Sequence, residues 1–135
     1  MPSPWAKVLA LAIGGAIGAN ARYWLGFWVA SWAGTRFPWS TLLINVSGAF
    51  ALGVFATIIE RYQPPSRTLL TEFLLVGILG GYTTFSTFTL ESLRLWHNGA
   101  LIRSLGYMAG SVTIGFAAVA LGVALTHAFI DRSLS

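Results

Sequence analysis

The sequence has no cysteine and very little charge. Charged side chains make up 9% of its 135 residues and hydrophobic side chains make up 56%, whereas a soluble domain usually carries about 25% charged residues. The low charge therefore excludes a soluble globular domain. The lack of cysteine excludes disulfides, thiolate metal sites and cysteine nucleophiles.

Basic clusters and catalytic motifs are also absent. The eight lysines and arginines are spread singly along the chain, which is typical of anchors at a membrane edge and indicates no nucleic-acid partner. The sequence contains no H-E-x-x-H motif, no G-x-S-x-G motif and no Walker lysine loop, the motifs that would indicate hydrolysis or nucleotide chemistry. We therefore predict that the protein is not an enzyme.

Four long apolar stretches fill the chain, at about residues 5–32, 39–59, 68–96 and 101–130. Each is long enough for a helix to cross the ~30 Å hydrocarbon core of a bilayer. The stretches are continuously apolar, whereas the strands of a membrane barrel alternate between apolar and polar residues. We therefore predict an all-α fold in which residues 1–135 form a single four-helix transmembrane domain. Tryptophans at the expected ends of the spans suit the headgroup region: Trp5, Trp32, Trp39 and Trp96.

The loops give the chain almost no preferred orientation. If both termini and the middle loop share one side of the membrane, that side carries four basic residues and the other side carries three. Because the Lys/Arg asymmetry of short loops sets topology, near-balance predicts insertion in both directions and pairing with an inverted copy. Four helices alone can hardly surround an aqueous pathway, so we expect an oligomer. Glycines four residues apart permit close helix approach: Gly14 and Gly18, Gly77 and Gly81, and Gly106 and Gly110.

The third span is interrupted near its centre. A straight helix over residues 68–96 would be ~43 Å long, well beyond the hydrocarbon thickness. Residues 80–84, G-G-Y-T-T, combine glycines and β-branched threonines, which are poor helix formers. A break there would free backbone carbonyls that can hold a small cation. The alternative is a kinked helix whose threonine hydroxyls bond back to the preceding turn.

Two phenylalanines follow this interruption on one helical face. Phe85 and Phe88 are three residues apart, and Ser86 and Thr87 supply hydroxyls around the same turn. The edge of an aromatic ring is electropositive, so two ring edges could partly replace the water around a small anion. The alternative is a pair of phenylalanines that only pack.

Polar residues in the second and fourth spans form two short stripes. Thr41 and Asn45 are four residues apart, as are Tyr107 and Ser111. The amide N–H groups of Asn45 can replace water around an anion. The alternative is that Asn45 only joins helices by hydrogen bonds.

A charged residue lies deep in the first span. Arg22 is more than two turns from the tryptophan at either end, and such a position is functional by default. Its charge could concentrate anions in a vestibule, or the side chain could snorkel to the membrane edge or pair with Glu60, Glu72 or Glu91. Glu91 follows Phe88 on a similar face, where it could line the mouth of a pathway.

Three segments resemble the Fluc (CrcB-type) fluoride channels of microbes. They are residues 14–23, residues 41–50 and, most specifically, residues 77–88, which contain G-G-Y-T-T-F-S-T-F. The resemblance covers nearly the whole chain and shows no departure in these motifs. It implies a passive, fluoride-selective channel in the plasma (inner) membrane that exports cytoplasmic fluoride. It further implies an antiparallel homodimer with two pores and a structural sodium ion at its centre.

The resemblance also assigns roles to individual residues. Backbone carbonyls of Gly80 and Thr83 would hold the sodium ion. Phe85 and Phe88 would meet fluoride edge-on, with Asn45 as a hydrogen-bond donor in the same pathway. Arg22 would contribute to an electropositive vestibule. Five residues with hydroxyl groups would extend the pathway as a polar track: Thr41, Tyr107, Ser111, Ser86 and Thr87.

Two other functions compete with a channel. A small multidrug-type, proton-coupled exporter also has four spans, but it needs a membrane-embedded carboxylate in the first span, and this span has no acidic residue. A structural or assembly subunit of a larger membrane complex predicts no transport by the purified protein alone.

Overall fold

A computed structural model describes residues 2–133, and this part of the chain is helical without strands. Four stretches of helix are long and apolar enough to cross a membrane, which confirms the predicted all-α, four-span fold. The third of these spans consists of four consecutive segments. The elements are α1 (Pro4–Ala33), α2 (Trp39–Tyr62), α3 (Arg67–Leu70), η1 (Thr71–Leu79), α4 (Gly80–Tyr82), α5 (Phe85–His97) and α6 (Leu101–Ser133).

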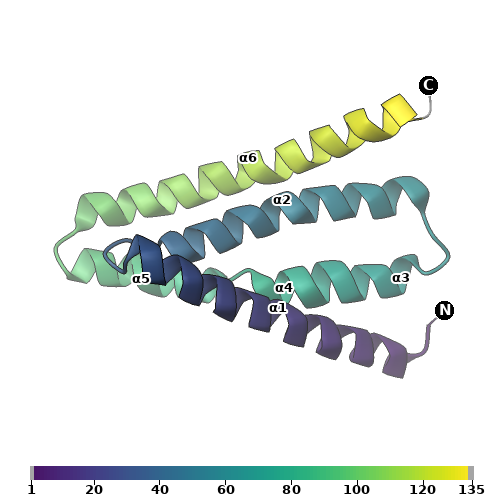
Figure 1. Ribbon diagram of the computed structural model, residues 1–135, viewed down its shortest axis with the longest axis horizontal. Coiled ribbons are helices and arrows are strands. Elements are labelled where there is room, and N and C mark those ends of the chain that lie inside the picture. Colours follow the sequence, from purple (N-terminus) through teal and green to yellow (C-terminus); the bar gives the residue numbers. More distant parts are fainter. Residues whose placement is uncertain (1, 134–135) are drawn as a thin grey trace.

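Short connections join the spans and arrange them as an elongated bundle (Figure 1). α1 ends at Ala33 and is followed by its C-cap, Gly34, which has a φ of 74°, a value that glycine adopts without strain. Gly99, between α5 and α6, has a φ of 76°. α1 begins and α6 ends at the same end of the bundle (Figure 1), as an even number of crossings requires.

Glycines let the helices of this chain approach closely. α1 packs along the third span and α2 packs along α6. A Cβ atom on Gly14 would lie 3.0 Å from the Cα of Gly77, and one on Gly81 would lie 2.8 Å from the carbonyl oxygen of Gly15. The glycine stripes at Gly14 and Gly77 therefore pack helices within the chain rather than between subunits. A Cβ on Gly106 or Gly110 would meet nothing within 4 Å, so the stripe on α6 stays open.

We expect Gly18→Ala to destabilise the fold strongly. A Cβ atom on Gly18 would overlap the backbone carbonyl of Ile78, and such overpacking against backbone costs about 3 kcal/mol or more. Gly15→Ala is the matched control, because its Cβ would meet no atom within 4 Å and alanine favours a helix by about 1 kcal/mol over glycine. Thermal unfolding in detergent should show a lower midpoint for Gly18→Ala alone. Equal midpoints for the two variants would contradict this packing.

The third span breaks at two consecutive threonines. Thr83 and Thr84 have extended backbone, with ψ angles of 160° and 119°. The predicted interruption is confirmed, but Gly80, Gly81 and Tyr82 remain helical, so the break lies at the C-terminal edge of the expected segment. The Thr83 hydroxyl also donates to the Leu79 carbonyl at 2.9 Å, which is the back-bonding considered as the alternative. The π-helical winding of η1 before the break was not predicted.

The outer surface is that of a membrane protein. Most large apolar side chains are exposed, and the few buried positions include glycines and threonines where helices cross. The four tryptophans expected at span ends lie within two residues of a helix end and are exposed. Lipid rather than a large internal core therefore covers most of the apolar surface.

Candidate functional site

Asn45 holds the unwound segment from the neighbouring helix. Its Oδ1 accepts a hydrogen bond from the backbone N–H of Thr84 at 2.8 Å, and its Nδ2 donates to the Thr84 carbonyl at 3.0 Å. The amide thus pairs the Thr84 N–H, which the break leaves without its helical acceptor, and adds a second hydrogen bond to the carbonyl of Thr84, the N-cap residue of α5. An amide nitrogen carries two hydrogens, so one N–H of Asn45 remains for another acceptor. Joining helices and binding an anion are therefore compatible roles for Asn45.

The break changes the hydrogen bonding of the two backbone carbonyls that were predicted to hold sodium. In an unbroken helix the N–H of Thr84 would donate to the Gly80 carbonyl, but it donates to Asn45 instead. The Gly80 carbonyl is thereby released at an exposed position and suits a hard cation. The Thr83 carbonyl already accepts a long, 3.4 Å hydrogen bond from the Arg22 guanidinium. The Gly80 carbonyl is therefore available to a cation, whereas the Thr83 carbonyl is shared with Arg22, whose positive charge opposes a second cation there.

Arg22 does not form the ion pairs that the sequence left open. The guanidinium is half-buried and its hydrogen bond goes to the Thr83 carbonyl. No salt bridge joins it to Glu60, Glu72 or Glu91, all of which belong to the described part of the chain. Its positive charge therefore lies directly beside the break.

Glu91 is the centre of a hydrogen-bond cluster between three spans. Thr41 of α2 donates to one carboxylate oxygen at 2.9 Å, and Tyr107 of α6 donates to the other at 2.9 Å. Sequence reasoning placed Thr41 and Tyr107 in the site and placed Glu91 at the mouth of a pathway or beside Arg22, but it did not predict that Glu91 joins Thr41 to Tyr107. The available signal was the position of Glu91, one turn beyond Phe88 on the same face of α5.

The two phenylalanines lie in different surroundings. Their ring centroids are 5.7 Å apart, and Phe88 also meets Tyr107 edge-on at 5.1 Å. Phe88 is 8% exposed, whereas Phe85 is 76% exposed. Phe88 therefore belongs to the interior beside the Glu91 cluster, and Phe85 points out of the chain.

The predicted hydroxyls are also divided. Ser111, one turn from Tyr107, has a buried hydroxyl that makes no hydrogen bond; a buried polar atom of this kind calls for a partner. Thr84, which sequence reasoning left without a site role, caps α5 and accepts from the backbone N–H of Thr87 at 3.2 Å. Ser86 is exposed, and its hydroxyl lies outside these contacts. The signal for Thr84 was a threonine directly before a helix, the usual N-cap.

Two cavities that include polar and charged lining residues adjoin at Ser40 near the start of α2. One, of about 490 Å³, is lined by the α1–α2 loop and the end of α5 and reaches Glu91. The other, of about 370 Å³, is lined by Arg22, Thr41, Thr84 and Thr87. Because Ser40 borders both cavities, they adjoin at this residue, and we refer to the two cavities together as the polar route.

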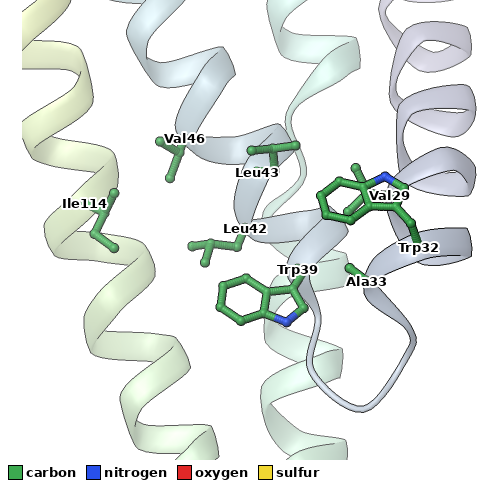
Figure 2. A pocket seen from close by; sticks show the side chains of 8 residues that line it. All are labelled: Val29, Trp32, Ala33, Trp39, Leu42, Leu43, Val46 and Ile114. Carbon is green, nitrogen blue, oxygen red and sulfur yellow. The ribbon is translucent and has the colours of Figure 1, made fainter.

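A larger cavity, of about 570 Å³, is almost entirely apolar. It opens between α1, α2 and α6 (Figure 2). Trp32 lies at the end of α1 and Trp39 at the start of α2. No charged side chain lines it, so we do not assign it to ion binding. Its lining residues are Val29, Trp32, Ala33, Trp39, Leu42, Leu43, Val46 and Ile114.

These features define a multi-pass membrane protein in which amide, hydroxyl and aromatic groups of three spans converge beside a helix break. The chain belongs to the CrcB family. Residues 9–123 match the family described as "CrcB-like protein, Camphor Resistance (CrcB)".

Its relatives carry the name of a channel. A protein of Nitrobacter winogradskyi is 43% identical over 91% of this chain and 97% of its own length. A protein of Chloroflexus aurantiacus is 44% identical over 91% and 97%, and one of Rhizobium etli is 41% identical over 92% and 98%. All three are named "Fluoride-specific ion channel FluC". A family of channels agrees with the prediction that this chain is not an enzyme.

Proposed function

We propose that this chain forms a passive, fluoride-selective channel. The observation that carries the proposal is the free N–H of Asn45 beside the break, one turn of α5 from the buried ring of Phe88 and its edge-on contact with Tyr107. The buried, unpaired hydroxyl of Ser111, one turn from Tyr107, is a further donor of the described chain. Relatives that match nearly the whole chain are named fluoride channels, which supports the same function.

The physical chemistry of fluoride suits neutral donors. Fluoride is small and strongly hydrated, so a pore must replace several water hydrogen bonds and still release the ion. Amide, hydroxyl and ring-edge dipoles do this without the deep trap that a fixed positive charge would create. The larger chloride gains less from closely spaced donors. The negative-inside potential, ~2.3 kcal/mol per charge per 100 mV, would drive export from the cytoplasm across the inner membrane.

Glu91 sets a condition on the route. Its two carboxylate oxygens accept from Thr41 and Tyr107, so these hydroxyl hydrogens are held by Glu91. An ion at this point must pass the carboxylate or replace it as the acceptor of one hydroxyl. Thr41 and Tyr107 would then serve fluoride in alternation with Glu91.

We further infer that the channel is an antiparallel homodimer. Phe85 and Gly80 are exposed beside the break, and the Ser111 hydroxyl lacks a partner among residues 2–133. An inverted copy packed on the break would cover the first two and complete a pathway with residues of both subunits. The near-balance of basic residues supports such dual insertion. A C-terminal tag found on one face of the membrane in every molecule would contradict it.

A structural sodium ion belongs to this proposal at the dimer centre. The released carbonyl of Gly80 would hold it, with the Thr83 carbonyl joining once Arg22 gives way. The positive charge of a bound sodium ion would attract the carbonyl groups at the breaks of both subunits and so hold the two subunits together there. Arg22 would otherwise keep the Thr83 carbonyl and contribute positive potential to the adjoining cavity.

Fluoride efflux from liposomes containing only this protein tests the function. We expect rapid fluoride loss when a potassium ionophore relieves the opposing potential, and no chloride loss under matched conditions. A proton-coupled exporter would instead require a proton gradient. An assembly subunit would give no flux of either ion, and that result would overturn the proposal.

A further inference from the structure

Two arginines line the cavity at the outer end of the polar route. This cavity of about 490 Å³ lies between the loop at residues 34–38 and the last turns of α5. Arg36 comes from the loop and Arg94 from α5, and Ser40 and Glu91 also line it. Residues far apart in the sequence thus bring two positive charges to one opening.

Neither guanidinium is neutralised by the chain. Among residues 2–133, no salt bridge or side-chain hydrogen bond engages the Arg36 or Arg94 guanidinium. Both side chains are exposed. Arginine stays charged at all ordinary pH values and offers five N–H donors. The two groups are therefore free to act on an anion in the cavity.

The charge of the cavity depends on this pair. Glu91 is the acidic residue among those that line the cavity. Its carboxylate accepts hydrogen bonds from Thr41 and Tyr107. With both arginines the lining carries one net positive charge, whereas without them it would carry one net negative charge. A negative lining would repel the ion that the route is proposed to conduct.

We propose that Arg36 and Arg94 form an anion-collecting entrance that offsets the charge of Glu91 and raises the rate at which fluoride reaches Ser40. The proposal rests on the function proposed above. It assigns the arginines a positioning role, because they act on the approach of the ion rather than on its passage beside the break. The higher rate of fluoride entry comes from the positive charge at the cavity and needs no tight binding site.

Flux at different ionic strengths tests the entrance. In water, one unit charge about 10 Å away changes the local concentration of a monovalent ion about twofold. We therefore expect Arg36→Gln and Arg94→Gln each to lower the initial fluoride flux about twofold at 10 mM salt. The double variant should lower it about fourfold. At 1 M salt, where the Debye length falls to about 3 Å, the variants should approach the parent chain.

Matched variants separate this effect from general surface charge. Arg103→Gln removes the same charge at the same end of the bundle, but Arg103 is exposed and does not line the cavity; its flux should stay near that of the parent. Replacing Arg36 and Arg94 together by lysine should restore the flux, because the charge is kept. Equal flux for the parent and the double glutamine variant at 10 mM salt would overturn the entrance alone. Absence of flux in the parent would overturn the channel and, with it, the entrance.

Discussion

Asn45→Asp is expected to abolish fluoride conduction while the protein still folds. In the parent, one N–H of Asn45 donates to the Thr84 carbonyl and the other remains free. An ionised aspartate would repel fluoride, and a protonated aspartic acid would spend its single O–H on the Thr84 carbonyl. Either form removes the free donor. The loss of about 3 kcal/mol of stabilisation for the ion corresponds to a fall in flux of about a hundredfold.

The aspartate variant keeps the main structural contact of Asn45. One carboxyl oxygen can still accept from the Thr84 N–H, which is the shorter of the two bonds. An unchanged elution volume and helical circular dichroism, together with lost efflux from liposomes, would therefore place the defect in conduction. Conduction at the parental rate would place Asn45 outside the pathway and leave it a purely structural residue.

Phe85→Ile should lower fluoride flux at least tenfold. The side chain is 76% exposed in the chain, so the substitution leaves little internal packing to lose. Isoleucine is apolar but has no ring quadrupole and therefore no electropositive edge, and a tenfold fall in rate corresponds to the loss of about 1.4 kcal/mol of stabilisation for the ion. Initial efflux rates from liposomes at equal protein density would measure the change. We expect Phe88→Ile to reduce flux as well, with an added packing cost because Phe88 is buried.

A matched phenylalanine provides the control for Phe85. Phe116 is 74% exposed and lies on the face of α6 opposite Tyr107, where we expect lipid. Phe116→Ile should therefore conduct like the parent. If Phe85→Ile also conducted like the parent, ring-edge contact with the ion would be excluded for Phe85.

The architecture was predictable because it follows from hydropathy and helix propensity. Four apolar runs require four spans, and a pair of glycines followed by a pair of threonines weakens one of them. The location of the break within that run was not predictable from propensity. Asn45 fixes it, since its amide oxygen accepts from the Thr84 N–H in place of the Gly80 carbonyl and its amide nitrogen donates to the Thr84 carbonyl. That choice depends on how α2 packs against the third span.

The site was predictable only in part, for a similar reason. Thr41 and Tyr107 were recognised because they are polar residues at helical spacing in apolar spans, and the structure brings them together. Their common partner, Glu91, and the bond from Arg22 to the Thr83 carbonyl join segments distant in the sequence. Spacing within a single helix carries no information about such contacts. The roles of Ser86 and Thr87 as ion contacts remain predictions.

Selectivity is the property that follows most directly from a pathway built of neutral donors. It is measured by the reversal potential of a bilayer containing the purified protein, with fluoride more concentrated on one side and chloride making up the difference on the other. Fluoride passage without chloride predicts a reversal potential near the equilibrium potential of fluoride. A reversal potential near zero would mean that the larger halide crosses equally well, and it would contradict this account.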